Sequence, residues 1–145
     1  MRGLNAVIVP KLVQLPRITD LIDDVCLSKS KHLSCLDLFR GYYNVSLNKD
    51  SRKFTSFTSP LTGVRYMYTS APFGLSTSPA AMMFILNRIF SGKLRKSVFL
   101  YLDDLCITGD TWENHLINLK NTFEEIEKNS LVCSPKKMRV WGESN

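Results

Sequence analysis

The chain has 145 residues, of which 44% are hydrophobic and 22% are charged, with a net charge of +6. This length suits one domain with a real core, and the composition excludes a disordered or low-complexity chain. No apolar run is long enough to span a membrane, and no signal peptide is recognisable, so no membrane partner is expected. The positive charge favours nucleic acid, then an acidic membrane surface. An indifferent basic surface explains the charge alone equally well.

The four cysteines lack the C-x-x-C spacing of zinc sites. Three lie in apolar runs, where cysteine behaves as a small hydrophobe. A reducing compartment within the cell, cytoplasmic or nuclear, fits this usage. His32 and His115 are isolated in the sequence and favour structural or surface roles over catalysis.

The first half of the chain predicts alternating helix and strand. Residues 1–15 look irregular, and apolar residues at helical spacing predict a helix over 17–28. Extended segments are expected over 33–39 and 43–47. A hairpin is expected between two further strands, because Pro60, Leu61, Thr62 and Gly63 have strong turn chemistry. Its strands are predicted at 54–58 and 64–69.

The second half predicts a helix that begins near Pro79 and ends near Phe90, a hairpin over 98–108 and a helix over 112–129. Asp110 and Glu113 have capping-box spacing before this last helix. Its apolar stripe is expected at Leu116, Leu119, Phe123 and Ile126. Two closing strands are expected after it, at 131–133 and 138–141. The fold class predicted is α+β, with antiparallel hairpins and helices on one face of the sheet.

Two adjacent carboxylates, Asp103 and Asp104, interrupt the 98–108 hairpin between apolar strands. Like charges beside a core repel each other and lose solvation, so they need a counter-charge, and a divalent metal is the natural one. Asp37 interrupts another apolar strand. Three carboxylates from neighbouring strands would hold two Mg²⁺ ions roughly 3.5–4 Å apart for phosphoryl transfer. An isolated Asp-Asp pair is more often a simple turn.

Three ordered motifs favour a metal site over a simple turn. Two upstream segments, Leu15-Pro16-Arg17-Ile18 and Arg2-x-Leu4-Asn5, support the same interpretation. The three motifs are Leu36-Asp37-Leu38-Phe39-Arg40-Gly41-Tyr42, Pro72-Phe73-Gly74-Leu75-Ser76-Thr77-Ser78-Pro79-Ala80 and Tyr101-Leu102-Asp103-Asp104. In order and spacing they closely resemble the motifs of reverse transcriptases, above all those of gypsy-like long-terminal-repeat retrotransposons and retroviral Pol. The resemblance implies a ferredoxin-like polymerase palm with a partial fingers segment.

The resemblance also implies roles for single residues. Asp37, Asp103 and Asp104 would be catalytic and would bind two Mg²⁺, or Mn²⁺ in their place, with help from the backbone carbonyl of Leu38. The incoming deoxynucleotide would meet Phe39, Arg40, Gly41, Tyr42 and Phe73, with Tyr42 obstructing a 2′-hydroxyl. Core packing beside Tyr43 is the alternative for Tyr42. Gly74, Pro79 and Tyr101 would contact template or primer, although Tyr101 also suits a core. Met82, Met83, Phe84, Ile85 and Leu86 are interpreted as helix core.

The pattern departs from the family at Phe39, where members commonly carry arginine. In extent, residues 1–15 correspond to the end of the fingers and 16–145 to the palm, with thumb, connection and ribonuclease H absent. The expected function is RNA-directed DNA synthesis on a primed RNA or DNA template, as part of a Pol polyprotein. The rivals are an inactive remnant that binds nucleic acid non-specifically, and a phosphotransferase or cyclase on the same scaffold. Tyr42 and the segment from Phe73 to Pro79 argue against the last.

Overall fold

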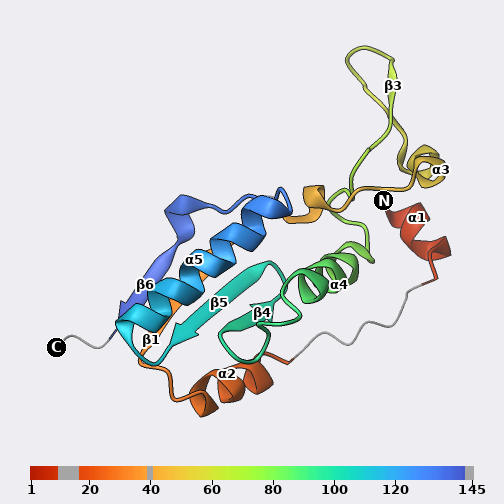
Figure 1. Ribbon diagram of the computed structural model, residues 1–145. Helices are drawn as coiled ribbons and strands as arrows, with labels where there is room; N and C mark the ends of the chain where they lie inside the picture. The colour runs from red at the N-terminus through yellow and green to blue at the C-terminus, as the bar shows by residue number, and fades with distance from the viewer. Residues whose placement is uncertain (10–16, 39–40, 143–145) are drawn as a thin grey trace.

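The computed structural model describes residues 1–9, 17–38 and 41–142. Its centre is a four-stranded antiparallel sheet in the order β4-β5-β1-β6 (Figure 1). The strands are β1 (His32–Asp37), β4 (Val98–Tyr101), β5 (Asp104–Gly109) and β6 (Arg139–Gly142). The expected α+β class is therefore confirmed.

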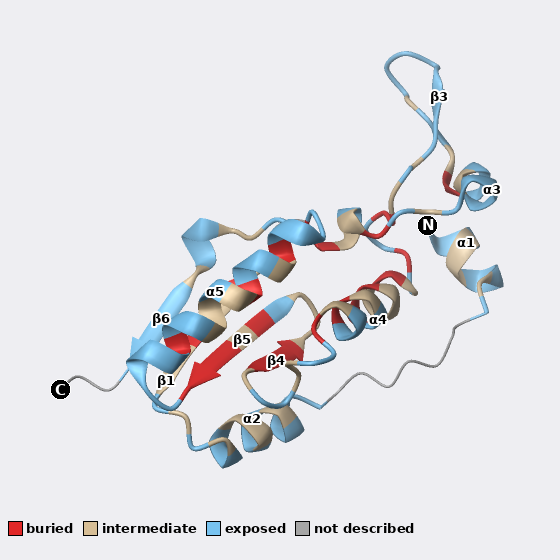
Figure 2. Ribbon diagram, viewed as in Figure 1, coloured by how far each residue is buried: buried red, intermediate tan, exposed pale blue. Residues whose placement is uncertain are grey.

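One face of the sheet is covered by two helices, α4 (Ser78–Ile89) and α5 (Trp112–Lys128). Alternation along β1 and β5 sends Leu36, Leu105 and Ile107 into this core, where each is at most 1% exposed. Figure 2 shows the buried residues gathered between α5 and the strands. The core is therefore built mainly from the alternate strand residues that point to one face of the sheet and from the inward sides of two helices.

A third helix, α2 (Ile18–Leu27), lies against β4. Phe99 pairs with Cys106, so it points away from the α4 and α5 layer, yet it is only 2% exposed. Phe99 and Leu21 of α2 line one cavity of about 750 Å³. Thus α2 adds a partial second layer over the other face of the sheet, at β4.

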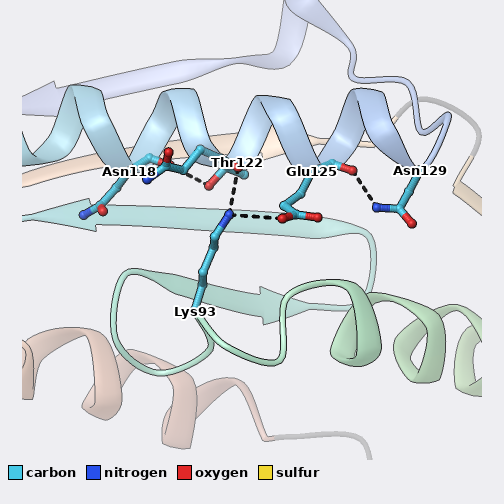
Figure 3. Close-up of polar contacts among 6 residues, drawn as sticks. Lys93, Asn118, Thr122, Glu125 and Asn129 are labelled. Atoms are coloured by element: carbon cyan, nitrogen blue, oxygen red, sulfur yellow. Dashed lines mark hydrogen bonds and ion pairs between the residues drawn. The ribbon is translucent and has the colours of Figure 1, made fainter.

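A lysine ties the loop after α4 to α5 (Figure 3). The ammonium of Lys93 donates to the carbonyl of Asn121 at 2.9 Å and lies 3.6 Å from the carboxylate of Glu125. Within the helix, the Thr122 hydroxyl donates to the Asn118 carbonyl. The contacts of Lys93 thus join the loop after α4 to α5, and both helices flank the same core.

A separate lobe projects beyond one end of the sheet (Figure 1). It contains the short helices α1 (Arg2–Val7) and α3 (Lys49–Arg52) and the two-stranded hairpin of β2 (Phe57–Thr58) and β3 (Arg65–Tyr66). Single-turn 3-10 helices occupy Gly41–Asn44, Lys53–Thr55 and Pro135–Lys137. The hairpin was predicted, with longer strands than the structure has.

Several local predictions were wrong. Residues 2–7 form a helix rather than an irregular segment, and 41–44 form a 3-10 turn where an extended segment was expected to begin. Thr111, rather than Asp110, caps α5, because its hydroxyl accepts the N–H of Asn114 at 3.2 Å. Phe84 is 59% exposed rather than part of the core. The expected strand at 131–133 is also absent, since Cys133 forms only an isolated bridge with Leu38, just past the end of β1.

Candidate active site

The β4–β5 turn presents the predicted acidic pair at one end of the sheet. Tyr101 and Asp104 are the last paired residues, with Leu102 and Asp103 between them. Leu102 has φ of 56°, a left-handed conformation that a hairpin turn normally gives to glycine. Holding a leucine there costs roughly 1–3 kcal/mol. The fold therefore keeps a strained backbone at the position that presents Asp103.

Strand β1 brings Asp37 to the same end. Asp37 pairs with Asp104 across the ladder. The N–H of Leu38 donates to the carbonyl of Asp103 at 3.1 Å, and the carbonyl of Asp37 accepts from Ser134 at 2.8 Å. The expectation that Asp37 lies on a strand next to the acidic pair is confirmed, because β1 and β5 are neighbours.

The acidic residues face two cavities. Asp37 and Asp103 line one of about 310 Å³ together with Gly41, Tyr42 and Phe73. Asp37 and Asp104 line a second, of about 570 Å³, with Tyr101. Carboxylate oxygens suit Mg²⁺. Within residues 1–9, 17–38 and 41–142, however, no three Asp, Glu, His or Cys side chains are grouped closely enough to hold a metal.

Lys137 occupies part of the site and was missed from the sequence. Its ammonium lies 2.9 Å from a carboxylate oxygen of Asp37, and its side chain is 66% exposed. This ion pair raises the pKa of Lys137, first through the hydrogen bond to Asp37 and then through its charge. The basic run from Lys136 to Arg139 was the available signal. Lys137 is a counter-charge from the protein itself at the position predicted for a metal ion.

The acidic residues and Lys137 lie close together, and this closeness shifts pKa values in the site. Loss of solvation raises the pKa of Asp104, and the charges of Asp103 and Asp37 raise it further, while Lys137 opposes the shift. The pKa of the Tyr42 phenol is also raised, by desolvation and then by the charge of Asp103. Negative charge thus accumulates at this end of the sheet with only partial compensation, an arrangement that favours a bound cation.

Gly41 and the aromatic residues form the other side of the smaller cavity. A Cβ atom at Gly41 would lie 3.2 Å from the Met82 side chain and 3.4 Å from that of Asp103, so the Met82 side chain would have to shift slightly to admit it. Phe73 packs edge-on against both Tyr42 and Tyr43, with centroids 5.6 and 5.4 Å apart. Tyr42 also packs on the core, as the alternative interpretation of this residue expected. Phe39 and Arg40 lie outside the described residues.

The predicted template residues surround the start of α4. Gly74 has φ of 83°, and Pro79 lies in the first turn of α4, where proline is favoured. Asn5 holds this loop to α1: its amide donates to the Gly74 carbonyl at 2.8 Å and its oxygen accepts the Ser76 N–H at 3.0 Å. Tyr101 is half-buried on the other cavity. Hence Tyr101 does not share a cavity with Tyr42 and Phe73.

The sequence that builds this fold, with carboxylates at the end of two neighbouring strands, matches the family model for "Reverse transcriptase (RNA-dependent DNA polymerase)" over residues 1–144. The chain belongs to the reverse transcriptase family. It is 34% identical over 136 residues to the retrovirus-related Pol polyprotein of transposon 412 from Drosophila melanogaster, covering 94% of this chain and 11% of that protein. The Pol polyprotein of transposon gypsy, from the same organism, is 26% identical, with 99% of this chain and 13% of the relative covered.

Solved structures show the same fold. The foamy viral protease-reverse transcriptase in complex with an RNA/DNA hybrid superposes with a TM-score of 0.83 at 23% identity, covering 96% of this chain and 18% of that one. A form of that enzyme with double-stranded DNA gives a TM-score of 0.80 at 22% identity, covering 96% and 24%. The chain therefore spans a small part of its relatives.

None of the helices in the described part of the chain is long and apolar enough to cross a membrane.

Proposed function

We propose that this chain is the catalytic palm of an RNA-directed DNA polymerase, with the end of the fingers in about its first 15 residues. The observation that carries the proposal is the cavity in which Asp37 and Asp103 meet Tyr42 and Phe73. Carboxylates for cations and aromatic rings for a nucleotide face the same space. The reaction would extend a primer by one deoxynucleoside monophosphate and release pyrophosphate.

The metal would be held by Asp37 and Asp103, with Asp104 and the carbonyl of Leu38 assisting. When bound, two Mg²⁺ ions would activate the primer hydroxyl and neutralise charge on the leaving pyrophosphate, and Mn²⁺ would substitute. Because Lys137 contacts the Asp37 carboxylate at 2.9 Å, its ammonium has to give way there and would then be free to pair with the triphosphate.

Tyr42 would lie beside the deoxyribose and obstruct a 2′-hydroxyl. The Tyr42 ring packs against Phe73, and Phe73 packs in turn against Tyr43. A ring held in this way suits a steric filter better than a mobile side chain would. Gly41, Phe39 and Arg40 would complete the nucleotide side, and Gly74, Pro79 and Tyr101 the template and primer side. The partners would be a primed RNA or DNA template, deoxynucleotides and the rest of a Pol polyprotein.

The second candidate is a retroelement remnant that binds nucleic acid weakly and does not polymerise. It is favoured by the Lys137 ammonium, which already pairs with the Asp37 carboxylate at 2.9 Å. It is also favoured because, among the described residues, no three Asp, Glu, His or Cys side chains are grouped closely enough to hold a metal. Both candidates share the fold and the family. They differ in whether the acidic residues bind a metal and support synthesis.

Primer extension on poly(rA)/oligo(dT) with Mg²⁺ separates the two. We expect extension by the chain that is lost in Asp103→Asn, because that substitution removes a charged ligand from the cavity. Asp110→Asn is the matched control, since Asp110 is exposed and lies just past the other end of β5. Mn²⁺ binding followed by electron paramagnetic resonance gives an independent readout. A chain that neither extends primers nor binds Mn²⁺ through Asp103 is the remnant.

A further inference from the structure

Two cysteines face each other across the ladder that carries the acidic residues. Cys35 of β1 is the direct partner of Cys106 of β5. Their sulfur atoms are 2.9 Å apart, and both cysteines are free thiols. They are 71 positions apart in the sequence, which explains why cysteine spacing gave no sign of a pair.

The register places this pair where a disulfide fits. Leu38 and Asp103 are a hydrogen-bonded pair, with the Leu38 N–H donating to the Asp103 carbonyl. Hydrogen-bonded and non-hydrogen-bonded pairs alternate along an antiparallel ladder, so Cys35 and Cys106, an odd number of pairs away, form a non-hydrogen-bonded pair. Such Cα atoms lie about 4.5 Å apart, within the roughly 4.4–6.8 Å that disulfides span.

The pair is open to a small oxidant. Both side chains are partly exposed, and both line the cavity of about 570 Å³. The charged residues that line the same cavity are Lys136, Lys137, Arg139, Asp37 and Asp104. The basic residues outnumber the acidic ones by one, so an anionic disulfide such as oxidised glutathione meets a small excess of positive charge there. Cys26 is exposed on α2, and Cys133 forms an isolated bridge with Leu38 just past the end of β1, so neither has this arrangement.

We propose that Cys35 and Cys106 are a redox modification site that closes reversibly to a cross-strand disulfide. One sulfur, as a thiolate, attacks oxidised glutathione, breaking its S–S bond and releasing one glutathione thiolate. The second cysteine sulfur then attacks the mixed disulfide, forming the Cys35–Cys106 bond and releasing the second glutathione. Two electrons pass from the cysteine pair to the glutathione disulfide, and both cysteine protons go to solvent.

The site lies next to the acidic residues but does not depend on their proposed function. Asp37 follows Cys35 by two residues and Asp104 precedes Cys106 by two, so all four side chains leave the same face of the sheet. A disulfide there would link β1 to β5 at a point two residues along each strand from the carboxylates. A partly exposed bond of this kind is expected to be easily reduced, as the reducing interior of a cell requires.

The test is oxidation of the folded wild-type chain in a buffer of reduced and oxidised glutathione, followed by acid quenching and peptide mapping under non-reducing conditions. We expect one internal bond, a mass loss of about 2 Da, between the peptides that contain Cys35 and Cys106. The melting temperature should rise by roughly 10 °C and return when dithiothreitol is added. No variant is needed for this measurement, so a folding defect cannot hide the result.

The controls separate this pair from the other thiols. The Cys26→Ser, Cys133→Ser double variant should form the bond as the wild type does, while Cys35→Ser should accumulate glutathione on Cys106 instead of closing. In concentrated urea the wild type should give mixed pairings. The proposal is overturned if the folded wild type carries glutathione on Cys35 or Cys106 without closing. Oxidation confined to Cys26 and Cys133 would overturn it as well.

Discussion

The surroundings of Asp104 disfavour the negative charge on its carboxylate. Asp104 begins β5 opposite Asp37 and follows Asp103, and desolvation with both neighbouring charges raises its pKa. A carboxyl whose pKa is higher in the folded state binds protons more readily there than in the unfolded chain. The free energy of unfolding therefore falls as pH rises from the unfolded pKa, near 3.8, through the raised value.

Replacing Asp104 with asparagine should consequently stabilise the metal-free chain at neutral pH. Because the side chain is exposed, solvent screening limits the gain, and we expect the melting temperature to rise by about 1–3 °C at about pH 7. The difference should vanish near about pH 3, where the wild-type carboxyl is protonated as well. Asp110→Asn serves as the control. A lower melting temperature for Asp104→Asn at neutral pH would contradict the assignment.

Lys137 forms an ion pair that could not be predicted from the sequence. The sequence shows only a short basic run, typical of a solvated surface, whereas the structure places one of its lysines on Asp37 at 2.9 Å. Its neighbour Lys136 lines the cavity beside Cys35 and Cys106, as Lys137 itself does. Of these two lysines, only Lys137 forms the ion pair with Asp37, and a run of basic residues in the sequence gives no sign of which one does.

At the scale of elements, α5 was predicted with nearly the right ends and a partly correct buried face. Leu119 and Ile126 of the expected stripe pack in the core, whereas Leu116 and Phe123 are 45% and 37% exposed. His115, Thr122 and Ile126 are the buried residues of the helix. A buried histidine is acceptable here because its Nε2 is 2.8 Å from the hydroxyl of Ser34. Hydrophobicity alone could not identify a polar residue on the inner face.

A matched pair of substitutions on α5 tests this orientation. Ile126→Ala removes a side chain that is 5% exposed in the core and should lower the free energy of unfolding by about 2–4 kcal/mol. Leu116→Ala should lower it by less than about 1 kcal/mol, since that side chain is largely in water. Urea unfolding measures both. If Leu116→Ala proved the more damaging, the helix would be rotated from the position described.

At the scale of the whole molecule, apolar surface and positive charge both remain exposed. Ile18, Ile22 and Leu27 of α2 are 52%, 54% and 77% exposed, and Phe57 and Tyr66 of the hairpin are 48% exposed each. This chain corresponds to 11% and 13% of the two relatives from Drosophila melanogaster. If the chain binds nucleic acid as proposed, its net charge of +6 supplies a general attraction to the phosphate backbone.

Binding to a primed duplex should accordingly be weak and strongly dependent on salt. With two or three phosphate contacts, affinity should fall roughly 10- to 40-fold between about 50 and 200 mM salt. Fluorescence anisotropy with a labelled primer–template measures this, and a peptide nucleic acid duplex of the same sequence, which has no backbone charge, is the control. Affinity that does not change with salt would point to base or shape recognition in place of charge.

The sequence by itself determined what depends on short-range pattern. Two apolar runs in 98–108 predicted the hairpin of β4 and β5, Pro79 predicted the start of α4, and periodicity predicted α2 and α5, because neighbouring residues set these patterns locally. The order of the motifs identified the family and brought Asp37, Asp103 and Asp104 together as candidates. Only the tertiary structure decided contacts between distant segments: Lys137 with Asp37, Asn5 with Gly74, and Cys35 with Cys106. These depend on strand register and chain path, which the packing of the whole core fixes.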